Sequence, residues 1–99
     1  EDKTVLAAEQ VDVELASLQG WTREGIIIRR HFVLANFKDI TAFLQHLVDT
    51  IATQNHHPDF SLDTGSRTVA VAVATHSEGG VTRSDIQFAT TLNEWTPSG

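Results

Sequence analysis

Cysteine is absent from the 99 residues of this chain, and basic residues and long apolar runs are scarce. Without cysteine there is no disulfide framework, no thiolate metal ligand and no thiol nucleophile. No apolar run approaches the roughly 20 residues that a membrane-spanning helix needs. The first residues, Glu1 to Thr4, lack the basic and apolar regions of a secretory signal. We therefore expect a cytoplasmic protein with no membrane partner.

Acidic residues outnumber basic ones by thirteen to seven, which gives a net charge of −6 at pH 7. A surface of this sign repels the phosphate backbone of DNA and RNA, so nucleic acid is not an expected partner. The length and the 40% content of hydrophobic residues suit one compact unit with its own core. We therefore expect residues 1–99 to form a single domain.

Apolar residues at helical spacing predict three helices. One amphipathic stripe runs through Ala8–Leu18, and a longer one runs from Ile40 to Ile51 after Asn36, which is a good N-cap residue. A third helix is predicted after Gly79-Gly80, because Thr82 and Asp85 have the spacing of a capping box. The helices are thus separated by segments with a different pattern.

Those segments alternate with a period of two and predict strands. From Trp21 to Leu34 the alternation is interrupted by Glu24-Gly25, the expected turn of a hairpin, and Thr68–Thr75 places valines on one face and alanines on the other. Such a strand at a sheet edge would pair with a second copy of the chain. The order of elements predicts an α+β fold with helices on one face of an antiparallel sheet.

Histidine is concentrated around one predicted helix-to-strand corner. Asn55-His56-His57-Pro58 is followed nineteen residues after His57 by His76, and nine residues later by Asp85. Proline pushes the residue before it out of helical geometry, so the long helix has to end here. Imidazoles exchange protons near neutral pH, and a carboxylate can orient them. These residues are our candidates for a proton-transfer site.

Each candidate also has a structural alternative. His56 and His57 can simply cap the carbonyl end of the long helix, and Asp85 can do no more than complete the capping box. Adjacent histidines point in different directions and make a poor zinc site, so no metal is expected. We expect His31 on a sheet face and His46 on the solvated side of the long helix.

Several segments resemble the pterin-4a-carbinolamine dehydratase family. They are Gly20-Trp21, Arg30-x-Phe32, Phe37–Asn55, His56-His57-Pro58, Thr75-His76, Ser77–Thr82 and Asp85. The resemblance spans nearly the whole chain. It implies a four-stranded antiparallel sheet with three helices packed on one face, in the order α-β-β-α-β-β-α. It also implies assembly into homodimers or homotetramers through sheet edges or helices.

The resemblance further implies a reaction, the loss of water from a 4a-hydroxytetrahydropterin without a metal or organic cofactor. A general acid would protonate the departing hydroxyl, and a base would take a proton from the ring nitrogen. The catalytic residues carried over from the family are His56, His57, His76 and Asp85. The substrate-binding residues carried over are Pro58, Thr75 and His76.

The chain departs from the family pattern at two positions. Ala52 stands where an acidic residue is expected, four residues before His56, and Ser66 stands where an aromatic residue is expected, ten residues before His76. A carboxylate there would orient an imidazole or hold the polar edge of a pterin, and a ring would pack against the planar ligand. Both losses predict weak pterin binding and poor turnover.

Three functions follow from the resemblance. The first is a degenerate member that has lost activity and acts as an assembly factor for RuBisCO in α-carboxysomes, with the RuBisCO large subunit as its partner. The second is an active dehydratase in tetrahydropterin recycling. The third, a dimerisation cofactor of transcription factors, has no specific support in the sequence. Ala52, Ser66 and the acidic surface favour the first.

Overall fold

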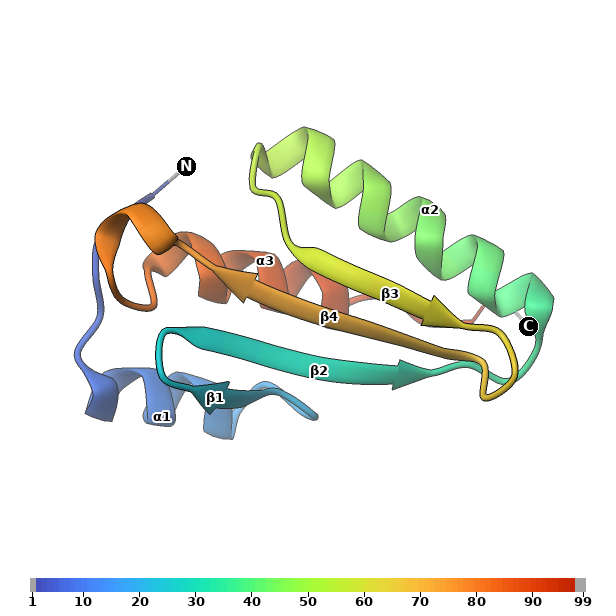
Figure 1. Ribbon diagram of the computed structural model, residues 1–99, viewed down its shortest axis with the longest axis horizontal. Coiled ribbons are helices and arrows are strands. Elements are labelled where there is room, and N and C mark those ends of the chain that lie inside the picture. The colour runs from blue at the N-terminus through green and yellow to red at the C-terminus, as the bar shows by residue number, and fades with distance from the viewer. Residues whose placement is uncertain (1, 98–99) are drawn as a thin grey trace.

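The computed structural model describes residues 2–97, which form three α-helices, four β-strands and one short 3₁₀ helix (Figure 1). The strands make one four-stranded antiparallel sheet, as the family resemblance implies, and their order in the sheet is β1-β2-β4-β3. The elements are α1 Ala8–Ala16, β1 Thr22–Glu24, β2 Ile27–Val33, α2 Phe37–Gln54, β3 Asp59–Asp63, β4 Thr68–Ala74, η1 His76–Glu78 and α3 Arg83–Asn93.

One face of the sheet is covered by the helices. The valines of β4 are fully buried and belong to the same core as Val11 of α1, Phe43 of α2 and Phe88 of α3. The alternation predicted for β4 is therefore confirmed, because its alanines lie on the opposite, outer face and are only half-buried. His31 is exposed on that outer face, as expected. Among the described residues, no helix is long and apolar enough to span a membrane.

Aromatic side chains connect the sheet to α2 and α3. Phe32 of β2 lies 4.5 Å from Phe43 of α2 between ring centroids, and Trp21 and Trp95 pack edge-on against Phe32 and Phe43. The tryptophans are thus part of the core. His46 Nε2 lies 2.8 Å from the carbonyl oxygen of Thr91 on α3, and its residue is half-buried. The prediction that His46 is a solvated surface residue is wrong, because α3 packs beside it.

The open edges of the sheet are β1 and β3. β4 pairs with β2 on one side and β3 on the other, so Thr68–Thr75 does not lie at a sheet edge. All five residues of β3 are exposed, including Phe60 at 45% and Leu62 at 37%. An exposed edge with apolar side chains is the kind of strand that pairs with another chain.

Candidate active site

The end of α2 sets the directions of the two neighbouring histidines. Asn55 caps the helix in the left-handed conformation with φ 50°, which asparagine tolerates better than most residues. The chain then passes through Pro58 into β3. His56 is buried at 4% exposure, whereas His57 is exposed. The imidazole of His56 therefore lies inside the protein, and that of His57 lies in solvent.

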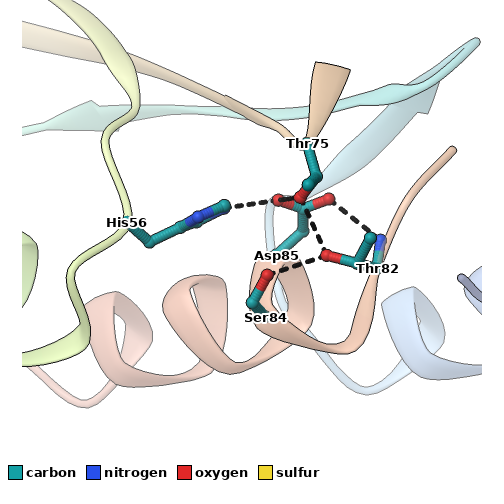
Figure 2. A network of polar contacts seen from close by, with 5 residues as sticks. All are labelled: His56, Thr75, Thr82, Ser84 and Asp85. Atoms are coloured by element: carbon teal, nitrogen blue, oxygen red, sulfur yellow. Dashed lines mark hydrogen bonds and ion pairs between the residues drawn. The ribbon is translucent and has the colours of Figure 1, made fainter. Parts of the chain in front are cut away.

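A buried carboxylate binds the inward imidazole (Figure 2). His56 Nε2 lies 2.6 Å from Asp85 Oδ1, and Asp85 is 0% exposed. The Thr75 hydroxyl donates to the same oxygen at 3.0 Å, and the backbone N–H of Thr82 donates to Oδ2 at 3.0 Å. A buried carboxylate is stable only when its oxygens accept such hydrogen bonds. Both oxygens of Asp85 are satisfied.

The same carboxylate opens α3. Asp85 and Thr82 form the predicted capping box, and the Thr82 hydroxyl also lies 2.8 Å from both the Thr75 and Ser84 hydroxyl oxygens. Figure 2 shows how the end of β4 and the start of α3 meet through these hydroxyls. The alternative that Asp85 only caps the helix is wrong, because it also binds His56. The part played by Ser84 had no signal in the sequence.

The position of His56 is fixed on two sides. Its ring meets Phe88 edge-on, with 5.9 Å between ring centroids, and its Nε2 is held by Asp85. Since an ionised carboxylate has no proton to give, the imidazole N–H is the donor in this contact. The Nε2 side of the His56 ring is therefore bound in the protein interior.

The three candidate histidines line one open depression of about 340 Å³, which we call the histidine depression. His57 lines it just after the end of α2, and His76 lines it as the first residue of η1. Both residues are exposed. Thr75 connects this surface to the buried network through its hydroxyl. The depression is lined by Lys3, Asn55, His56, His57, Ala74, Thr75, His76 and Ser77. The fold thus brings together residues that are separate in the sequence.

The two positions that depart from the family pattern, Ala52 and Ser66, lie far apart. Ala52 is exposed near the end of α2, on the histidine side of the molecule. Ser66 lies in the turn between β3 and β4, at the opposite end of β4 from His76 (Figure 1). The seven residues of β4 alone extend roughly 20 Å. Within one chain, the expectation that Ser66 belongs to this site is therefore wrong.

Other expected residues are placed as follows. Pro58 follows His57 and is half-buried, and it does not line the histidine depression. In the described part of the chain, no group of three histidine, aspartate or glutamate residues is arranged to hold a metal ion. The side chains at the depression that can exchange protons are the imidazoles, the Lys3 amine and the hydroxyls of Thr75 and Ser77.

Comparisons with known proteins point to one family. Residues 4–95 match the family model described as pterin 4 alpha carbinolamine dehydratase. A Mycobacterium avium protein named "Putative pterin-4-alpha-carbinolamine dehydratase" is 37% identical over 89 residues, covering 90% of this chain and 93% of its own. A Mycolicibacterium vanbaalenii protein of the same name is 40% identical over 85 residues, covering 86% and 89%.

A solved structure has the same fold. It is the "transcriptional coactivator/pterin dehydratase from Brucella Melitensis", with a TM-score of 0.82 and 29% sequence identity, covering 91% of this chain and 96% of the other. The four-stranded sheet, the three helices and the matched sequence lead to one conclusion. The chain belongs to the pterin-4-alpha-carbinolamine dehydratase family.

Proposed function

We propose that this chain binds a 4a-hydroxytetrahydropterin in the histidine depression and catalyses its dehydration weakly. The observation that carries the proposal is the 2.6 Å contact between His56 Nε2 and Asp85 Oδ1 beneath the exposed His57 and His76. A buried carboxylate that orients an imidazole next to two accessible imidazoles is an arrangement suited to proton transfer. Family membership supports the same chemistry.

The reaction needs two proton transfers and no change of oxidation state. The C4a–O bond breaks, the hydroxyl leaves as water after receiving a proton, and the ring nitrogen loses a proton as the C=N bond forms. His57 and His76 are the accessible groups that can give and take these protons. His56 has its Nε2 on Asp85, so we assign this pair to positioning the corner and His57.

We attribute the weak turnover to Ala52, which replaces the acidic residue of the family pattern. Asp85 already provides the carboxylate that holds His56, so an acid at position 52 would serve the substrate rather than that imidazole. Ala52 leaves one polar edge of the pterin without a charged partner, and such a hydrogen bond is worth about 1.5–3 kcal/mol. The loss predicts a rate reduced by about one to two orders of magnitude.

A stopped-flow dehydration assay tests the proposal, with wild type and Ala52→Glu compared under identical conditions. We expect slow, saturable dehydration by the wild type and at least a tenfold increase in kcat/KM for Ala52→Glu. Thr53→Glu, an exposed change at the neighbouring position of α2, is the matched control and should leave the rate unchanged. Wild-type activity equal to the uncatalysed rate would remove the dehydratase role.

A second candidate is the assembly of RuBisCO in α-carboxysomes, with the large subunit as partner. The net charge of −6 and the exposed Phe60 and Leu62 on the open edge of β3 support a protein-binding role. The test is co-elution with the RuBisCO large subunit in size-exclusion chromatography. We expect Phe60→Asp to abolish co-elution and Val13→Asp, at a 72% exposed site on α1, to preserve it.

We also propose that the chain forms homodimers or homotetramers. The unpaired edge of β3 offers backbone N–H and C=O groups together with Phe60 and Leu62. Light scattering on the purified protein should give a mass of two or four chains, and Phe60→Asp should lower it to one. A wild-type monomer would contradict this assembly.

A further inference from the structure

Part of β2 has no neighbouring strand on the side of β1. β1 is three residues long and pairs only with residues 27–29, whereas β4 pairs with all seven residues of β2. In Figure 1, β2 extends well past β1. His31 and Val33 are exposed, Val33 at 71%. Residues 30–33, which we call the open stretch of β2, therefore form a sheet edge that is separate from the edge at β3.

The backbone groups of His31 and Val33 point toward this open edge. The N–H of Leu34 donates to the carbonyl oxygen of Arg67 at 2.8 Å, on the β4 side, and the register of β2 with β4 continues from there without interruption. In an antiparallel ladder, successive residues of a strand turn their N–H and C=O groups to opposite sides. Phe32 thus shares the side of Leu34. The N–H and C=O groups of His31 and Val33 face the other side, where the described part of the chain provides no backbone partner.

Two cavities flank the open stretch of β2. One of about 410 Å³ lies where β2 ends and α2 begins, and its apolar wall includes Leu34, Leu92 and the half-buried Trp95. The other, of about 310 Å³, lies beside the start of β1 and is lined by Gly20, Thr22, Arg29, Arg30 and His31. A strand added at this edge would therefore have room for its side chains in both directions.

The cavity beside β1 is lined by cationic side chains in a chain of net charge −6. None of the described residues that line it is acidic. An ion pair of Arg29 Nε with Glu24 Oε1 at 2.8 Å orients one guanidinium, and the Gln19 carbonyl oxygen accepts from Arg30 Nη1 at 2.9 Å. Together with His31, these fixed donors favour carboxylate groups on a partner.

We propose that an extended peptide segment of another protein, with acidic and apolar side chains in alternation, adds to the open stretch of β2 as an antiparallel strand. Its backbone pairs with His31 and Val33, since strand addition gains its affinity from main-chain hydrogen bonds. Its acidic side chains share the face of Arg29 and His31, and its apolar side chains turn toward the cavity beside Trp95. The inference is independent of dehydration, because these cavities share no residue with the histidine depression.

The test is a titration of ¹⁵N-labelled protein with the synthetic peptide acetyl-Glu-Leu-Glu-Leu-Glu-amide, followed by amide hydrogen exchange. In the free protein, the amides of His31 and Val33 should exchange faster than those of Arg30 and Phe32, which face β4. Saturating peptide should slow exchange at His31 and Val33 at least tenfold and leave Arg30 and Phe32 unchanged. The same peptide with lysine in place of glutamate should bind at least tenfold more weakly.

Methylated peptides separate strand addition from other modes of binding. In an antiparallel pair, the residues opposite His31 and Val33 are the glutamates, and their N–H groups point at β2. A peptide N-methylated at the glutamates should therefore bind at least tenfold more weakly than one N-methylated at the leucines. Equal binding, or weaker binding of the leucine-methylated peptide, would overturn the proposal without any change to the protein.

A variant places the binding at β2. His31→Glu should weaken binding of the peptide at least tenfold, while Thr53→Glu, which also introduces a carboxylate but at an exposed site near the C-terminal end of α2, should leave it unchanged. Equal effects of the two variants would overturn the proposal. Slow exchange of the His31 and Val33 amides without peptide would overturn it as well, because a second copy of the chain would then occupy the edge.

Discussion

A carboxylate lies near each end of α2, and the two have opposite surroundings. Asp85, near the C-terminal end of α2, accepts hydrogen bonds from His56, Thr75 and Thr82. Asp39, at the N-terminal end, has no side-chain partner in the described part of the chain. The first carboxylate holds other residues of the protein in place, whereas solvent reaches the oxygens of the second, which are not among the buried polar atoms without a partner. This difference separates a buried, internally completed network from a carboxylate that acts mainly through the charge it places at the start of α2.

The largest expected effect follows from breaking the completed network. Asp85→Asn removes the charge that His56 and two hydrogen-bond donors share, while keeping the size of the side chain. We expect the free energy of unfolding to fall by about 3–5 kcal/mol, because the partners of a buried charge are left unsatisfied. Urea denaturation measures the change. A loss below about 1 kcal/mol would show that the network contributes little.

A smaller effect is expected from one hydroxyl of that network. Thr75→Val keeps the shape of the side chain but removes the donor to Asp85 Oδ1 and the contact with the Thr82 hydroxyl. The free energy of unfolding should fall by about 1–2 kcal/mol. Thr41→Val, an exposed change on α2, is the control and should cost less. Equal losses for the two variants would contradict the role given to Thr75.

At the N-terminal end of α2, Asp39→Asn should leave the free energy of unfolding nearly unchanged. Asp39→Asn removes a charge that solvent reaches and that interacts favourably with the start of α2, and such an interaction contributes little. We expect the free energy of unfolding to stay within about 1 kcal/mol of the wild type. Calorimetry gives the value. A loss as large as that of Asp85→Asn would mean that the two carboxylates are equivalent.

The smallest effect is expected at Ser66. Ser66→Trp restores an aromatic residue but places it at the far end of β4 from His76, where Ser66 Oγ donates to Asp63 Oδ2 at 2.7 Å. We expect kcat/KM for dehydration to change by less than about twofold, since the ring cannot reach the histidines of its own chain. A large gain in activity would instead show that a second copy brings this turn to the site.

Local signals in the sequence predicted most of the fold. The N-cap Asn36, the apolar stripe of α2 and the capping box of Thr82 and Asp85 each depend on residues within a few positions, and each is present in the structure. The valine and alanine alternation of β4 likewise identified the buried face. Which strand lies at the edge depends on pairing across the sheet, and the pattern of Thr68–Thr75 could not reveal it.

The site was predictable in part for the same reason. His57 and His76 come together because a helix end and a strand end meet, which the motif indicated. The spacing of ten residues misplaced Ser66, because the seven residues of β4 lie between Ser66 and His76 and hold them at opposite ends of the strand. The cavity of about 410 Å³ near the start of α2 could not be predicted, because it forms only when β2, α2 and α3 pack together.

The central claim is that His57 and His76 transfer protons above a positioning pair, His56 and Asp85. Single-turnover dehydration of a 4a-hydroxytetrahydropterin by His76→Ala, compared with wild type and the exposed-surface variant His31→Ala, tests it most directly. The account predicts a rate at least about 10²-fold lower for His76→Ala and an unchanged rate for His31→Ala. A His76→Ala rate equal to that of the wild type would contradict it.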